Sequence, residues 1–75
     1  MTLDTIMAQL KSYGRATLYC ESKTDRWCVK VDLPRHEGID VKLAVHADDS
    51  IVAAGECERL ASEIVRERAG EEDGE

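Results

Sequence analysis

The segment from Trp27 to Leu33 constrains the fold more than any other part of the chain. Its large apolar side chains fall at every second position, and polar or small residues lie between them. This alternation predicts a β-strand with one buried and one exposed face. The segment also holds the only tryptophan of a chain that has no phenylalanine. Because no other segment offers a comparable apolar anchor, we expect this strand to lie at the centre of the core.

Two flanking segments alternate in the same way. Residues 16–21 come before the central strand, and residues 39–46 follow it after a loop from Pro34 to Gly38. Links this short favour antiparallel neighbours. The sequence therefore predicts a three-stranded antiparallel meander with residues 27–33 in the middle.

The register of the first hairpin follows from which side chains must share a face. We expect Leu18 opposite Val31 and Cys20 opposite Val29, with a loop over residues 23–26. The alternative register requires a tight Lys-Thr turn, which lacks the Gly or Asn that such turns favour. The preferred register sends Cys20 inward and Cys28 outward, which argues against a disulfide between them.

Apolar residues at helical spacing predict a helix at each end of the chain. The first covers residues 3–13, with Thr2 as N-cap and Gly14 as the residue that ends it. The second begins after residues 48–50 and runs to about Arg68, with Gly70 as a stop. Gly55 within it costs about 1 kcal/mol relative to Ala, which suggests a close backbone neighbour or an irregular first turn. The apolar arc of this helix comprises Ala53, Cys57, Leu60, Ala61, Ile64 and Val65.

The element order defines an α+β fold of type α-β-β-β-α, with both helices packed on one face of the sheet. We expect one domain over residues 1–69 and a disordered acidic tail over residues 70–75. The net charge is −6, and residues 48–75 hold ten acidic and three basic side chains. The acidity is thus concentrated in the last third of the chain.

Composition narrows the classes of function. No apolar run reaches the roughly 18–20 residues that cross a bilayer, and the N-terminus lacks a secretion signal. This favours a cytoplasmic protein. The three cysteines lack the paired spacing of zinc sites, and no catalytic motif is present. We expect no metal, no cofactor and no enzymatic activity.

The order helix, three-strand meander, helix resembles the topology of double-stranded RNA-binding domains. The segment from Ser50 to Ile64 is similar to the last helix of that family in its alanine-rich, Leu-Ala-x-x-Ile pattern. In that family, lysines at the start of this helix grip phosphates, whereas this chain has Asp48 and Asp49 there, with Glu56 and Glu58 following. Carboxylates at these positions would repel phosphates. The resemblance therefore implies the fold without the RNA-binding activity.

In size, acidity and compact layout, the chain also resembles small single-domain proteins that phages and prophages encode, anti-CRISPR inhibitors among them. This resemblance implies an inhibitor that acts in the cytoplasm of a host cell.

The first candidate surface is an acidic line on the long helix. Its carboxylates share one flank and could imitate a row of phosphates in a basic groove of a partner. The alternative is a solvated face, because Arg59 and Arg66 are spaced to pair with neighbouring glutamates. The acidic line comprises Asp49, Glu56, Glu63 and Glu67.

The second candidate surface is the sheet face that the helices leave open. A tyrosine among basic residues on an open sheet is typical of single-strand nucleic-acid binding. Glu21, Asp32 and Asp40 share the face, however, so a mixed-charge wet surface is the alternative. The candidate residues on it are Tyr19, Arg26, Lys30, Lys42 and His46.

Together these features predict a small non-catalytic binding protein that engages a protein or nucleoprotein complex through the acidic helix. Direct nucleic-acid binding through the open sheet face is one alternative, and the single aromatic residue and the acidic residues on that face disfavour it. A structural protein that forms a homodimer through an edge strand or the open sheet is the other.

Overall fold

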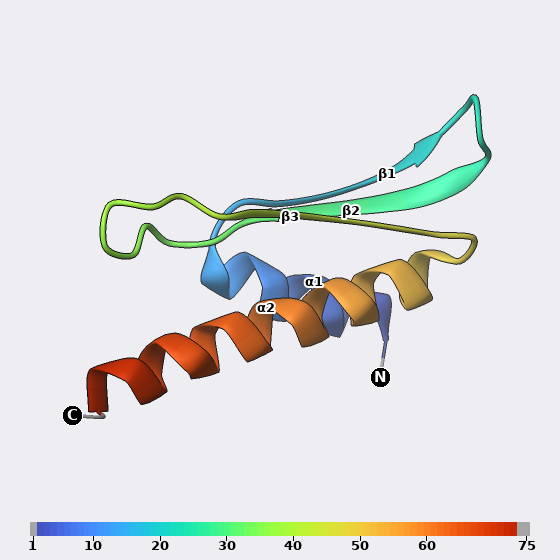
Figure 1. Ribbon diagram of the computed structural model, residues 1–75. Coiled ribbons are helices and arrows are strands. Elements are labelled where there is room, and N and C mark those ends of the chain that lie inside the picture. The colour runs from blue at the N-terminus through green and yellow to red at the C-terminus, as the bar shows by residue number, and fades with distance from the viewer. Residues whose placement is uncertain (1, 74–75) are drawn as a thin grey trace.

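The computed structural model describes residues 2–73, and the side chains of residues 2–68. The elements follow the predicted order, which confirms the α+β fold of type α-β-β-β-α. The strands form one antiparallel sheet in the order β1-β2-β3, and both helices lie on the same side of it (Figure 1). The elements are α1 (Leu3–Tyr13), β1 (Ala16–Glu21), β2 (Arg26–Asp32), β3 (Lys42–Ala47) and α2 (Ser50–Asp73).

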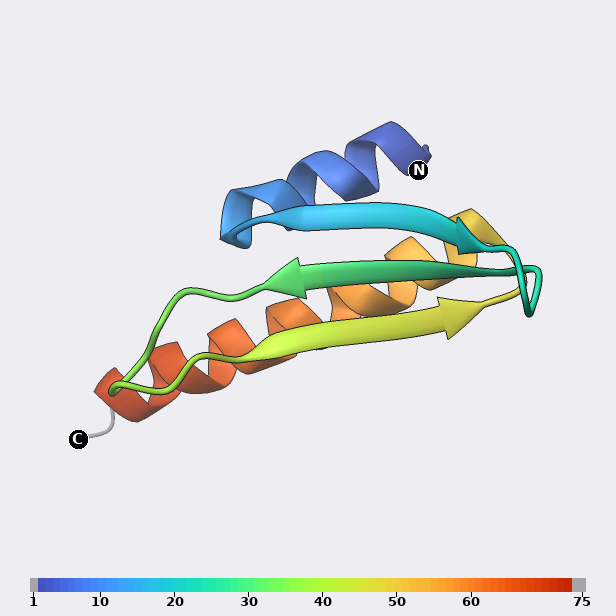
Figure 2. The ribbon, with the colours of Figure 1, turned by 90° about the horizontal axis from the view of Figure 1, so that it is seen from above.

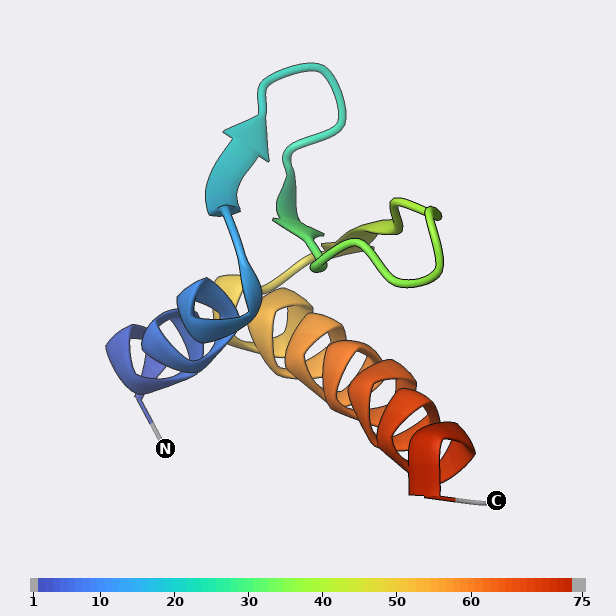
Figure 3. The same cartoon turned by 90° about the vertical axis from the view of Figure 1, so that its left-hand side faces the viewer.

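The core lies between β2 and the two helices. Val29 and Val31 on the central strand are fully buried, as is Leu10 of α1. The fully buried residues of α2 are all small, which lets the helix backbone lie close to its neighbours: Ala53, Ala54, Cys57 and Ala61. Seen from above the sheet, α2 runs beneath β2 and β3 while α1 lies on the β1 side (Figure 2). The end-on view shows the strands and the helices as two separate layers (Figure 3).

The predicted register of the first hairpin is wrong by two residues. Leu18 lies opposite Val29, and Cys20 lies opposite Trp27. The loop covers residues 22–25, and Asp25 adopts a left-handed backbone conformation with φ 58°. Asp tolerates that conformation better than most residues, so a four-residue loop closes this register without a tight Lys-Thr turn. Since a shift of two residues preserves alternation, every side chain keeps its predicted face.

The third strand begins later than predicted. Ile39 was expected in the strand, but it closes a tight turn with His36, and their backbones exchange hydrogen bonds of 3.0 and 3.1 Å. Between them, Glu37 and Gly38 have φ values of 54° and 78°, as a type I′ turn requires. Ile39 is consequently 62% exposed, and the strand starts at Lys42.

The first helix has the predicted limits, but the glycine that follows it, Gly14, is required for a different reason than predicted. The Thr2 side chain accepts a hydrogen bond from the Thr5 amide at 3.3 Å, which confirms the N-cap. Gly14 is extended, with φ 171°, rather than left-handed. A Cβ at this position would collide with the backbone carbonyl of Asp32 in β2. Gly14 is therefore required by close approach of two backbones and not by a left-handed turn.

The second helix differs from the prediction at two glycines. The helix is continuous from Ser50 to Asp73, beyond the predicted end near Arg68, so Gly70 does not end it. A glycine inside a helix costs about 1 kcal/mol, which is too little to end it alone. No atom from another part of the fold lies within 4 Å of a Cβ built on Gly55, so the predicted close backbone neighbour is not found among the described residues. Of the predicted acidic tail, residues 70–73 are helical and 74–75 lie outside the described residues; the domain boundary stays a prediction.

Candidate functional site

The outer face of the sheet, which points away from the helices, gathers all five residues predicted for it. Tyr19 on β1, Cys28 on β2 and His46 on β3 form one cross-strand row. Lys30 belongs to the adjacent row of the same face, between Thr17 and Ala44. Arg26 and Lys42 lie toward opposite ends of it, opposite Glu21 and Asp32.

Most of the positive charge on this outer face already has a partner. The Lys30 ammonium lies 5.5 Å from the centre of the Tyr19 ring, within the range of a cation–π contact. The interaction with Tyr19 raises the pKa of Lys30. Arg26 Nε lies 3.4 Å from Asp48 Oδ1, which links the sheet to the segment before α2. The outer face is therefore a mixed-charge surface.

His46 and Glu21 connect the two edge strands across β2. The His46 Nε2 atom lies 3.4 Å from Glu21 Oε1, and both side chains are partly exposed. The pair is ionic when the imidazole is protonated. The carboxylate occupies the Nε2 side of the imidazole, a position from which the ring would donate to a phosphate or a base, so this residue is less available to either.

The cysteines follow the predicted faces but not the predicted exposure. Cys28 is on the outer face, as predicted, yet it is fully buried. Its cross-strand neighbours are Tyr19 and His46, and contact with the thiol raises the pKa of Tyr19. Cys20, predicted to be a buried thiol, is exposed because the β1–β2 hairpin projects away from the helices (Figure 1). Cys57 is buried as predicted, and burial raises the pKa of its thiol to about 11.

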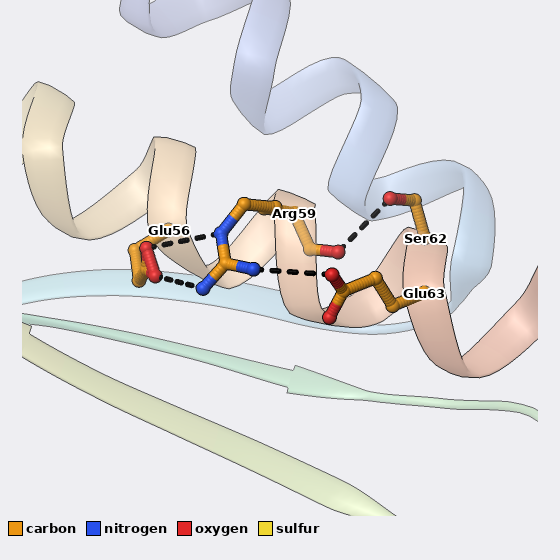
Figure 4. A network of polar contacts seen from close by, with 4 residues as sticks. All are labelled: Glu56, Arg59, Ser62 and Glu63. Atoms are coloured by element: carbon orange, nitrogen blue, oxygen red, sulfur yellow. Dashed lines mark hydrogen bonds and ion pairs between the residues drawn. The ribbon is translucent and has the colours of Figure 1, made fainter.

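The acidic line on α2 is organised by one arginine. Arg59 donates from Nε to Glu56 Oε1 at 3.3 Å and from Nη1 to Glu63 Oε1 at 3.1 Å, and a second guanidinium nitrogen also contacts Glu56. Figure 4 shows the guanidinium of Arg59 lying between the carboxylates of Glu56 and Glu63, an arrangement that we call the Arg59 clamp. The side chains of Glu56, Arg59 and Glu63 remain 40%, 55% and 50% exposed. Arg59 holds the pKa of Glu56 below its usual range, so this carboxylate stays charged to lower pH than an ordinary glutamate.

The ends of the acidic line are exposed. Asp49 comes just before the helix, and its carbonyl accepts the hydrogen bond from the Ala53 amide at 3.0 Å. Glu67 lies one turn beyond Glu63. Among the side chains that the structure describes, none forms an ion pair with Asp49 or Glu67. The line therefore keeps more acidic than basic groups even though Arg59 pairs with two of its members.

An apolar residue on this flank was missed by the sequence analysis. Val52 is 58% exposed and lies one helical turn before Glu56. On a helical wheel it falls outside the apolar arc, and that position is the signal that could have identified it. The surface that we call the acidic flank consists of Asp49, Val52, Glu56, Arg59, Glu63 and Glu67.

Sites of chemistry in proteins usually combine buried polar groups, metal ligands or a pocket. Among residues 2–68, no polar or charged side chain is buried. In the described part of the chain, no group of three or more His, Cys, Asp or Glu side chains is placed to hold a metal ion. A surface hollow of about 440 Å³ at the β1–β2 loop is lined by Cys20, Glu21, Ser22 and Lys23. Its lining offers no histidine or buried base to assist a nucleophile.

Comparison of the chain with protein-family models, with curated proteins and with solved structures finds no match. Within residues 2–73, neither helix has the length and apolar character needed to cross a membrane.

Proposed function

We propose that this chain is a small non-catalytic binding protein whose acidic flank docks on a basic surface of a protein or nucleoprotein complex. The observation that carries the proposal is the pair of exposed carboxylates, Glu56 and Glu63, held on either side of Arg59. Their geometry is set before a partner arrives. Less side-chain freedom is therefore lost on binding than for two independent glutamates.

Val52 favours a protein partner over a purely solvated face. An exposed apolar residue beside arginine and carboxylates matches the composition of protein interfaces, which have an apolar centre and a polar rim. Val52 is 58% exposed and lies within one helical turn of Glu56. The combination supports docking, with Val52 excluding water beside the charged contacts.

The same charges argue against direct binding of nucleic acid. Carboxylates on the acidic flank repel phosphates. On the outer face of the sheet, Arg26 and His46 already have acidic partners at 3.4 Å. A surface that binds phosphates needs cations free to replace counterions, so the acidic flank is the better supported site.

The role that we propose for such a binder is that of a phage-encoded inhibitor of the anti-CRISPR type. A nucleoprotein complex must hold phosphates in a basic groove. A rigid helix that presents carboxylates to such a groove would compete with the nucleic acid. The small size and the net charge of −6 suit this role.

The proposal is tested by capturing partners from a lysate of the host cell with the full chain and with the double variant E56K/E63K. We expect the double variant to lose the captured complex, because four units of charge change at the centre of the flank. Variant E37K is a control for charge reversal away from the acidic flank, since Glu37 is also exposed but lies in the β2–β3 turn. The proposal is contradicted if E56K/E63K captures the complex as well as the unchanged protein does. Circular dichroism checks that the fold of the variant is intact.

Variant R59A separates organised carboxylates from simple negative charge. It makes the flank more acidic but releases Glu56 and Glu63. If the fixed geometry of the two carboxylates matters, R59A binds its partner about threefold to tenfold more weakly, because the freed side chains must be ordered on binding. Tighter binding by R59A would contradict the role given to the clamp.

A further inference from the structure

The outer edge of β1 carries backbone groups that none of the described strands satisfies. Within residues 2–73, strand β1 lies at one side of the sheet with β2 as its one strand neighbour, and α1 runs along it on the helix side of the sheet (Figure 2). The Asp32 amide donates to the Arg15 carbonyl at 2.9 Å, so Arg15 turns its backbone groups toward β2. By the alternation of an antiparallel ladder, Ala16, Leu18 and Cys20 turn theirs toward the open edge.

This edge also lacks the features by which proteins protect such edges. Residues 16–20 include no charged residue, no proline and no glycine, whereas charged side chains and proline normally discourage pairing with another chain. The charges of β1 lie at its ends, with Arg15 before it and Glu21 as its last residue, whereas the other edge strand, β3, has His46 within it as well as Lys42 at its start. The contrast points to β1 as the edge that is kept open for pairing.

We infer that β1 pairs with β1 of a second copy of this chain, antiparallel, with Leu18 opposite Leu18 of the second copy. In this register the outward-facing backbone groups of residues 16, 18 and 20 meet their counterparts as hydrogen-bonded pairs. The two sheets become one continuous sheet, with the helix layers on the same side. Partly exposed Leu18, Tyr19 and Cys20 lose solvent contact at the junction.

The charges at the two ends of β1 select this register. With Leu18 on the two-fold axis, Arg15 lies opposite Glu21 of the second copy, and the reverse pair forms at the other end. Both residues belong to the outer face by alternation, in pairs whose side chains approach closely. Glu21 contacts His46 through Oε1, which leaves its other oxygen free to accept from the guanidinium. A self-complementary surface of this kind is what a two-fold dimer needs.

The association is measured by sedimentation and light scattering of the full chain from micromolar to millimolar concentration. We expect a dimer mass for the unchanged protein. Variant R15E should weaken the dimer about tenfold, because two attractive cross-strand pairs become repulsive. The double variant R15E/E21R should restore the dimer. Variant K42E is the matched control, since it makes the same charge change at the other edge and should leave the dimer unchanged.

A cross-link tests the register itself. In the inferred pairing Ala16 lies opposite Cys20 of the second copy, and hydrogen-bonded pairs have Cα atoms about 5.5 Å apart, within disulfide range. Variant A16C should form a reducible covalent dimer on mild oxidation, and A16C/C20S should not. Cys20 of the unchanged chain faces Ala16, so the unchanged chain should not cross-link.

A monomer mass at every concentration, or a dimer that R15E leaves intact and A16C does not trap, would overturn the inference. The acidic flank lies on α2, away from β1, so these outcomes are independent of partner capture. A monomeric protein that still captures a partner would contradict only the dimer. A dimeric protein without capture would contradict only the proposed function.

Discussion

Two glycines show how differently the same residue type acts at two positions. Gly14 has the carbonyl of Asp32 where a Cβ would lie, so its missing side chain allows the turn from α1 into β1 to pass close to β2. Gly55 has no atom of another element within 4 Å of that position. The sequence marked both as special, but it could not say which of them is required by packing, because a close approach arises only once β2 is in place.

We expect opposite effects from alanine at these two glycines. Variant G14A should lose about 3 kcal/mol or more, because the clash is with backbone that cannot move aside. Variant G55A should gain up to about 1 kcal/mol, which for a chain of this size raises the melting temperature by about 4–8 °C. Chemical and thermal denaturation followed by circular dichroism measure both. A destabilised G55A would indicate that the open space beside this glycine has a structural role.

At the scale of single elements, the hairpin shows what alternation can and cannot specify. Alternation put Leu18 and Val29 on the helix-facing side, and the structure has them there. It could not separate two registers that differ by two residues, since both preserve the faces. The difference was decided by Asp25, whose left-handed conformation closes a loop that the sequence analysis had not considered.

The Arg59 clamp on α2 leads to a prediction about pH. Arg59 lowers the pKa of Glu56, so the pairing contributes at neutral pH and is lost as the pH falls through the folded-state pKa of Glu56. In R59A we expect the pKa of Glu56 to rise toward its ordinary value. A carboxyl-carbon NMR titration of both proteins measures the change.

Asp40 is the internal control for this titration. Its pKa is lowered by Arg35 in the β2–β3 loop, and R59A should leave it unchanged. If Glu56 titrates identically in both proteins, the clamp does not persist in solution. The argument from organised carboxylates then fails with it.

For the whole molecule, two periodicities were sufficient to predict the architecture. A period of two marked the strands, and helical spacing marked the ends of the chain, so the α+β fold followed from the sequence. The candidate surfaces were less predictable because exposure depends on where elements end. Cys20 extends beyond the helices and Cys28 is covered by its cross-strand neighbours. Neither fact is encoded in the local pattern of either strand.

The size of the chain makes its fold sensitive to any loss from the core. With 75 residues, a total stability of roughly 3–5 kcal/mol is expected. Leu10 is fully buried, and replacing a buried leucine by alanine costs about 2–5 kcal/mol. Variant L10A should therefore lose most of its stability and show a broad or absent thermal transition at 25 °C and above.

Variant I39A is the control for L10A. It removes a similar side chain that is 62% exposed, and its free energy of unfolding should stay within about 0.5 kcal/mol of that of the unchanged protein. Urea denaturation of the three proteins measures the difference. Equal midpoints for L10A and the unchanged chain would mean that α1 contributes little to the core, and that the sheet and α2 are stable without it.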